Sequence, residues 1–155
     1  MAVEVVLREL QESDLPVLFE HQKDEEAAQM ADFPPRNWER FVKHWAKISA
    51  DPDILIRIIE ANGQVAGNIV SFVMEGHREV GYWIGREVWG QGIATQALRL
   101  FLSEETRRPL YGYTVEHNRA SQRVLEKCGF SYVGESAGVL NAAKQMVTEL
   151  IYRLD

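Results

Sequence analysis

EVGYWIGREVWGQGIATQAL, residues 79–98, is the most informative stretch of the chain. An apolar strand pattern runs into a glycine loop, and the loop opens into a helical pattern. Unpaired backbone N–H groups at a helix start point in one direction and, together with the helix macrodipole, attract anions. Gly90 and Gly92 would let a ligand approach the backbone without a Cβ in the way. We therefore expect this loop to bind a phosphorylated ligand.

Two other phosphate-binding motifs fit the stretch less well. Gly85 and Gly90 have the spacing of the first half of a P-loop, but Gln and Gly follow where a P-loop needs Lys and Ser or Thr, which excludes a nucleoside triphosphatase. GQG at residues 90–92 also begins a dinucleotide fingerprint, with Glu116 at the end of the next strand. Thr95 stands where that fingerprint needs Gly or Ala, and no further βαβ units follow.

Three segments together resemble a known family: GYWIG at 81–85, WGQGIAT at 89–95 and NRASQRVLEKCGF at 118–130. They look like the GNAT N-acetyltransferases, and within that superfamily like the Rim-type branch, which acetylates N-terminal amines of ribosomal proteins and includes small-amine acetyltransferases. The broad superfamily has Gln or Arg where this chain has Trp89, and the Rim-type branch often has an aromatic residue there. The resemblance implies an α+β GNAT fold, with a mixed, mostly antiparallel central sheet of about seven strands. About four helices would flank that sheet, which would be splayed between its fourth and fifth strands.

The resemblance assigns the phosphorylated ligand as acetyl-CoA. The loop amides would hold its pyrophosphate, and an edge of the preceding strand would pair with the pantetheine arm as an added strand does. The side chain of Asn118 would contact the cofactor near the pantetheine, although Asn is also an ordinary helix N-cap. The expected cofactor-binding residues are Tyr82, Trp83, Ile84, Gly90, Gln91, Gly92, Ile93, Ala94, Thr95 and Asn118.

Acetyl transfer to an amine needs a group that accepts the amine proton. Glu79 precedes the Gly81 strand segment and would lie beside the thioester, so it is the first candidate for the general base. It could instead be a solvated strand residue or pair with Arg78. Glu116, one strand over, is the second candidate. The Rim-type branch can place a base in the segment that follows Glu135, but residues 137–143 contain no carboxylate.

The departing thiolate needs a hydrogen-bond donor. The resemblance places the hydroxyl of Ser121 near the thioester sulfur, whereas the position alone also fits a first-turn helix residue. A serine hydroxyl is a weak acid, so it would act by hydrogen bonding more than by full proton transfer. Tyr111 and Tyr113 are alternative hydroxyls on the same strand–helix unit.

Size and composition predict a soluble protein of one domain. The 155 residues suit one domain, 1–155, and 46% hydrophobic residues with 26% charged residues are in the globular range. No signal peptide or membrane-length apolar run is visible, so we expect a cytoplasmic protein, monomer or homodimer, without a membrane partner. The net charge of −6 argues against nucleic acid and mildly favours cationic amines. Scattered histidines and the single Cys128, read as a small core residue, predict no metal site.

The remaining sequence predicts alternating short elements. We expect caps at Ser13–Asp14 and at Asn37 to start two helices, the second with Trp38, Phe41 and Trp45 on its inner face. Further helices are expected over about residues 91–106 and 119–128. Strands are expected over 3–8, 54–60, 64–74, 79–84, 110–115, 130–135 and 145–154.

The sequence therefore predicts an acetyl-CoA-dependent N-acetyltransferase that transfers an acetyl group to a primary amine by direct attack in a ternary complex. The alternative is a non-catalytic acyl-CoA-binding or sensory module on the same scaffold, which would keep residues 90–95 and could dispense with Glu79 and Ser121. The sequence does not indicate whether the acceptor is an N-terminal peptide amine or a small-molecule amine. Residues 31–45 and 136–144 would shape the acceptor site, and these are the segments in which members of the family differ most.

Overall fold

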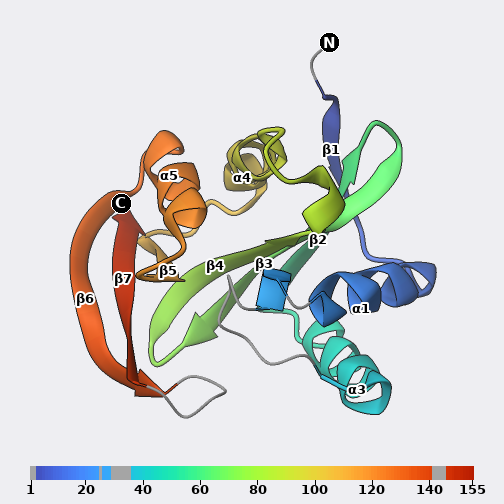
Figure 1. Cartoon of the computed structure of the whole chain (residues 1–155), viewed down its shortest axis with the longest axis horizontal. Helices are drawn as coiled ribbons and strands as arrows, with labels where there is room; N and C mark the ends of the chain where they lie inside the picture. Colours follow the sequence, from blue (N-terminus) through green and yellow to red (C-terminus); the bar gives the residue numbers. More distant parts are fainter. Residues whose placement is uncertain (1–2, 25, 29–35, 141–145) are drawn as a thin grey trace.

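The computed structural model describes residues 3–24, 26–28, 36–140 and 146–155 (Figure 1). Seven strands form one sheet in the order β1-β2-β3-β4-β5-β7-β6. All neighbours are antiparallel except β4 and β5, which are parallel and pair only at Glu79 and Tyr111. This single contact is the splay expected between the fourth and fifth strands. The strands are β1 Val5–Arg8, β2 Leu55–Ala61, β3 Gln64–Met74, β4 His77–Ile84, β5 Leu110–Val115, β6 Ser131–Leu140 and β7 Met146–Leu154.

Helices cover both faces of the sheet, with α4 and α5 on one side and α1 and α3 on the other (Figure 1). Ile93, Leu98 and Phe101 of α4 and Leu125 of α5 pack into one apolar core with inner residues of the sheet. Leu18 of α1 with Phe41 and Trp45 of α3 forms a second core against β2 and β3. The expected α+β architecture is confirmed. The helices are α1 Leu15–Lys23, α3 Trp38–Ser49, α4 Ile93–Glu104 and α5 Arg119–Lys127, with 3-10 turns at Glu12–Asp14 and Arg86–Val88.

Both helix starts predicted from the sequence are present, but only one of them has a side-chain cap hydrogen bond. Asn37 caps α3 as predicted, with Oδ1 accepting from the amide of Arg40 at 2.9 Å. Asp14 is the N-cap residue of α1 as predicted, but its side chain makes no cap hydrogen bond to that helix. Its carboxylate instead accepts from the Arg8 guanidinium at 2.8 and 2.9 Å and from the Gln11 amide at 2.7 Å. Trp38 lies on the same helix face as Phe41, as predicted, and packs against Phe19 of α1 and Phe41, although 44% of the residue is exposed.

The register of β4 leaves part of its backbone unpaired by β3. Gly85 donates its amide to the Ala66 carbonyl at 2.8 Å, and antiparallel pairs alternate, so the polar backbone groups of Glu79, Gly81 and Trp83 also point to β3. Those of Tyr82 and Ile84 consequently point the other way, into the splay beside β5. The splay therefore exposes a short strand edge inside the molecule.

A buried carboxylate, that of Glu105, forms ion pairs near the start of β4. Glu105 follows α4, is 1% exposed, and accepts from the Arg107 guanidinium at 2.8 and 2.9 Å. Arg78 lies 3.8 Å away and also pairs with Asp53 at 2.8 Å, so it does not pair with Glu79 as the sequence allowed. Although burial opposes ionisation, hydrogen bonds from Arg107 and Ser71 lower the pKa of Glu105 to about 2.

In the part of the chain described here, no helix is long and apolar enough to cross a membrane.

Candidate functional site

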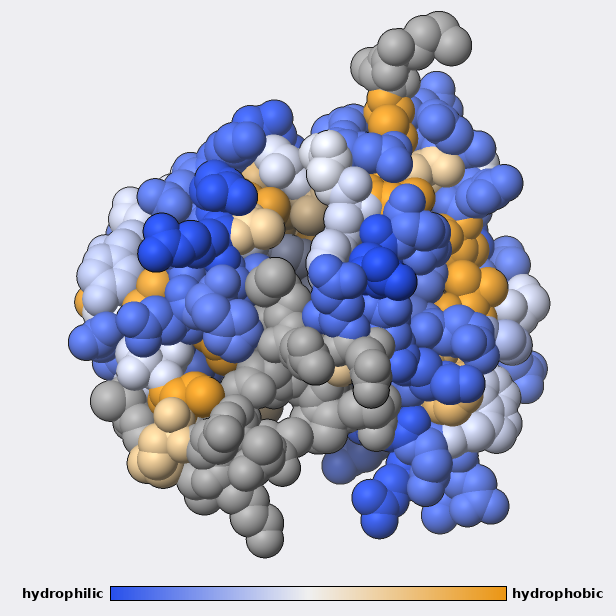
Figure 2. Space-filling model, in the orientation of Figure 1, coloured by the Kyte–Doolittle hydropathy of each residue, from blue (hydrophilic) through white to orange (hydrophobic). Residues whose placement is uncertain are grey.

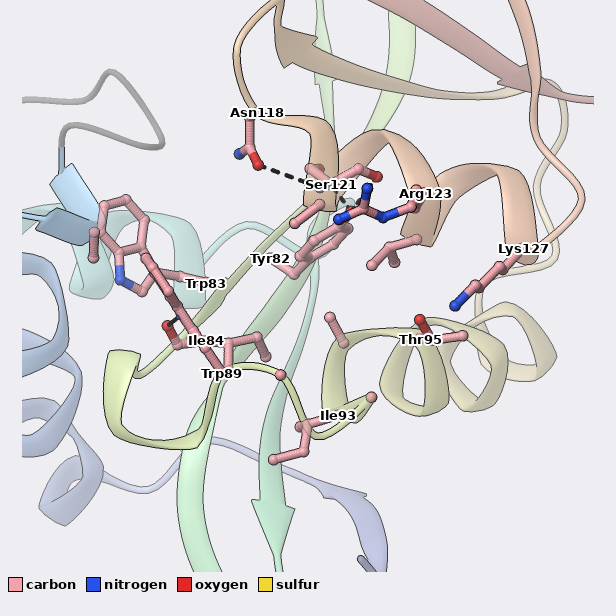
Figure 3. A pocket seen from close by; sticks show the side chains of 16 residues that line it. Tyr82, Trp83, Ile84, Trp89, Ile93, Thr95, Asn118, Ser121, Arg123 and Lys127 are labelled. Carbon is pink, nitrogen blue, oxygen red and sulfur yellow. Dashed lines mark hydrogen bonds between the residues drawn. The ribbon is translucent and has the colours of Figure 1, made fainter.

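The splay opens into a cavity of about 430 Å³ between β4, α4 and α5. Figure 2, in the orientation of Figure 1, shows hydrophobic residues set back between largely hydrophilic surfaces. Figure 3 shows the cavity from close by, with α5 above and the start of α4 below. Of the twelve site residues predicted from the sequence, ten line the cavity. Glu79 lies on the opposite face of the sheet, and Gln91 is not among the lining residues. The lining residues are Ala27, Tyr82, Trp83, Ile84, Trp89, Gly90, Gly92, Ile93, Ala94, Thr95, Asn118, Ala120, Ser121, Arg123, Val124 and Lys127.

The glycine loop forms one wall with its backbone. Gly90 and Gly92 have φ angles of 80° and 74°, which favour glycine, and a Cβ on either would project into open space. The first intrahelical bond of α4 runs from the Gln96 amide to the Gly92 carbonyl. The preceding amides therefore have no partner within the helix, and no side chain caps them. Gln91, which the sequence also assigned to the cofactor, is the one predicted loop residue that is not among the lining residues.

The exposed edge of β4 forms the next part of the wall. The backbone groups of Tyr82 and the amide of Ile84 point into the splay. The Ile84 carbonyl accepts from the indole N–H of Trp89 at 2.9 Å. Trp89 therefore caps the end of this edge, and a chain with alternating amide groups could add to it only between Tyr82 and the Ile84 amide.

Two basic side chains complete the wall on α5, and sequence reasoning missed them. Arg123 and Lys127 are one helical turn apart and both line the cavity. In Figure 3 the Lys127 side chain points toward Thr95 of α4, and the Arg123 side chain lies beside Ser121 and Tyr82. Their spacing was visible in the sequence, but only the packing of α5 beside α4 brings them to the cavity that the glycine loop also lines. Together, these groups provide a site suited to phosphate.

Asn118 and Ser121 begin α5 at the same cavity. Asn118 Oδ1 accepts from the Ser121 amide at 3.2 Å, so Asn118 is the helix N-cap and also lines the cavity (Figure 3). The Ser121 hydroxyl lies 2.8 Å from the hydroxyl of Tyr82. Tyr111 and Tyr113, the alternative hydroxyls, lie on the opposite face of the sheet from Ser121, because Gly112 between them faces Leu125 of α5.

Glu79 lies on that opposite face, beside the single contact between β4 and β5. Burial raises its pKa to about 7, and the charges of Glu149 and Glu75 add to the rise. Burial also raises the pKa of Tyr113, with Glu79 the strongest charge acting on it. Glu79 and Ser121 therefore flank the splay from opposite faces of the sheet. Glu116, the second candidate base, is exposed beyond the end of β5 and lines a different hollow.

Polar contacts hold the described residues at the end of α1 and just before α3. The buried side chain of Gln22 donates to the Arg36 carbonyl at 3.0 Å and accepts from the Arg36 amide at 2.7 Å. Arg86, in the turn after β4, pairs with Asp24 at 2.9 Å. Of the residues that the sequence assigned to the acceptor site, 31–35 and 141–144 lie outside the described residues. Across the described ranges, no group of three His, Cys, Asp or Glu side chains could hold a metal ion.

Comparison with solved structures shows the same fold in characterised acetyltransferases. The chain matches RimL, a ribosomal L7/L12 α-N-protein acetyltransferase in complex with coenzyme A, with TM-score 0.84, 21% identity, and 97% of this chain and 93% of that chain covered. It matches the microcin C7 self-immunity acetyltransferase MccE, in complex with acetyl-CoA and AMP, at TM-score 0.82 and 18% identity over 97% and 92%. It also matches the Vibrio cholerae spermidine N-acetyltransferase, in complex with CoA and spermine. The TM-score is 0.81, the identity is 16%, and 96% of this chain and 94% of that chain are covered.

Sequence comparison supplies the family. No curated protein sequence matches the chain. The profile described as "Acetyltransferase (GNAT) domain" matches residues 4–131, well over half of the chain. Together with the seven-stranded sheet and its splay, this match identifies the protein as a member of the GNAT acetyltransferase family.

Proposed function

We propose that this protein transfers the acetyl group of acetyl-CoA to a primary amine by direct attack in a ternary complex, and that it belongs to the Rim-type branch of the family. One observation carries the proposal. A single cavity joins amides at a helix start, two cations, an open strand edge and a hydroxyl, and a carboxylate lies across the sheet from it. Each of these groups matches one chemical part of the reaction.

Acetyl-CoA supplies the activated acetyl group, and the residues of the cavity fit it. Amides from Gly90 to Thr95 would hold the pyrophosphate, since φ values near 80° and open space at both glycines leave the backbone accessible. Arg123 and Lys127 would pair with its phosphates. The edge at Tyr82 and Ile84 would pair with the pantetheine amides, with Trp83 beside it and Asn118 at the end nearer Ser121.

Glu79 would accept the proton that the attacking amine loses. A carboxylate with a pKa of about 7 is partly ionised at neutral pH and is a stronger base than an ordinary glutamate. Its position on the face opposite the cavity lets the amine approach from the α1 and α3 side while acetyl-CoA occupies the other. The neighbouring Glu75 and Glu149 would favour a cationic acceptor.

A thiol-release assay with a panel of amines tests the proposal. The panel would hold a peptide with a free N-terminus, the same peptide with a blocked N-terminus, and a polyamine, since RimL and the spermidine enzyme share the fold. We expect release of CoA that depends on a free amine, and a product whose mass is increased by one acetyl group. Glu79→Gln should lower the rate by about 10²–10⁴-fold at neutral pH.

The alternative is a non-catalytic acyl-CoA-binding module. Calorimetry separates it from an enzyme, because such a module would bind acetyl-CoA and yet release no thiol with any amine. Failure to bind acetyl-CoA would contradict both functions.

A further inference from the structure

The hydroxyl of Tyr82 meets the hydroxyl of Ser121 across two elements. Tyr82 comes from β4 and Ser121 from the first turn of α5, and their oxygens lie 2.8 Å apart. Both side chains line the cavity, and Figure 3 shows the tyrosine ring reaching toward the start of α5. The contact fixes the Ser121 side chain at the point where the helix opens into the splay.

The direction of this hydrogen bond follows from the chemistry of the two hydroxyls. A phenol is a stronger acid than an aliphatic alcohol and therefore the better donor, while the serine oxygen is the better acceptor. The Ser121 carbonyl is a second acceptor, but it lies at 3.3 Å, and a single phenolic proton makes its stronger bond at the shorter distance. Tyr82 therefore donates to Ser121 Oγ, and the proton of Ser121 remains free for another acceptor.

Burial keeps Tyr82 in its neutral, donating form. Loss of water around the ring raises the pKa of the phenol well above its usual range, and the bond to Ser121 only partly offsets this. Tyr82 consequently does not surrender its proton during turnover, which leaves it the role of orienting its neighbour.

We propose that Tyr82 is a positioning residue, which turns the Ser121 hydroxyl so that its proton points at the sulfur of the leaving thiolate. This inference rests on the proposed function. In the step, the amine lone pair forms the N–C bond, the C–S bond breaks, and its electron pair goes to sulfur. The amine proton passes to Glu79 and then to solvent. The thiolate accepts a hydrogen bond from Ser121 and later takes its proton from solvent, so neither hydroxyl changes its protonation state.

Turnover of three variants tests the coupling. We expect Ser121→Ala to lower kcat about 10²-fold and Tyr82→Phe, which keeps the ring, about 10-fold, with the KM for acetyl-CoA little changed. The double variant should be within about twofold of Ser121→Ala, because Tyr82 acts only through Ser121. Tyr132→Phe is the matched control, because this tyrosine is 54% exposed on β6, away from the cavity.

A selenoester analogue of acetyl-CoA separates positioning from packing. Its selenolate is a weaker base than a thiolate and needs less hydrogen-bond help to leave, so the deficits of Tyr82→Phe and Ser121→Ala should shrink to about threefold or less. A purely structural defect would persist with both donors. The proposal would be overturned if each variant lost the same factor in kcat with the thioester as with the selenoester. It would also be overturned if the losses of Tyr82→Phe and Ser121→Ala multiplied in the double variant.

Bound CoA gives a readout that needs no acceptor. CoA carrying ¹³C at the carbon attached to sulfur reports the thiol pKa by NMR, and we expect that pKa to be higher by about one unit in Tyr82→Phe and Ser121→Ala than in the wild type. Equal values in all three proteins would overturn the role of Tyr82, whatever the activity. Binding of CoA without turnover by the wild type would leave this test intact and contradict only the catalytic function. No binding of CoA would contradict both.

Discussion

Replacing Glu79 with Gln should stabilise the protein, and the gain should depend on pH. The pKa of Glu79 is about 7 in the fold against an ordinary 4.5, because burial and the charges of Glu149 and Glu75 oppose ionisation. The native state thus binds this proton more tightly than the unfolded chain does. Stability linked to Glu79 is complete below about pH 4.5 and is lost as the pH rises through about 7. Gln carries no charge and avoids that loss.

The magnitude follows from the two pKa values. At about 1.36 kcal/mol for each pKa unit, the difference between 4.5 and about 7 corresponds to at most about 3.4 kcal/mol. Glu79 is only partly buried, and solvent screening reduces this to about 1.5 kcal/mol. For a chain of 155 residues that is a rise of about 3–6 °C in Tm at pH 8, and close to none at pH 4.

Thermal unfolding followed by circular dichroism at several pH values between about 4 and 8 measures the effect. Glu9→Gln is the matched control, because Glu9 is exposed just beyond β1 and its replacement removes one negative charge in the same way. A Glu79→Gln variant whose Tm differs from the wild type by the same amount at every pH would refute the reasoning. So would a variant that is less stable at pH 8.

Three further changes test other parts of the structure. Replacing both Arg123 and Lys127 with Gln should weaken acetyl-CoA binding by about 5–30-fold in calorimetry at low salt, and by less at high salt. Binding of an acetyl donor that is truncated before its phosphates should not change. Glu105→Gln should cost about 2–3 kcal/mol in urea unfolding at neutral pH, because it breaks a buried ion pair, and the cost should fall as the pH drops from about 4.5 toward 2, where the wild-type carboxyl also loses its charge. Gly67→Ala should lower Tm by several degrees, because its Cβ would lie 2.0 Å from a backbone oxygen of β4, whereas Gly81→Ala, with its nearest atom at 3.5 Å, should cost much less.

Local patterns predicted most of the fold and the backbone part of the site. The glycine loop and the Asn37 cap depend on residues within a few positions of each other, and the structure contains both. Asp14 is at the N-cap of α1 as predicted, but its carboxylate binds Arg8 of β1 in place of a helix amide, and the cap pattern did not indicate that partner. The pairing of Tyr82 with Ser121 joins residues 39 positions apart and needs the packing of α5 on β4.

The two hydrogen bonds between Gln22 and the backbone of Arg36 fix both ends of an intervening stretch of chain. Because the buried Gln22 amide bonds only main-chain atoms of residue 36, this connection between α1 and the residue just before α3 does not depend on the side chain at position 36. Replacing Arg36 with other residues except proline would therefore change the side chain at this position while keeping the connection between the two helices.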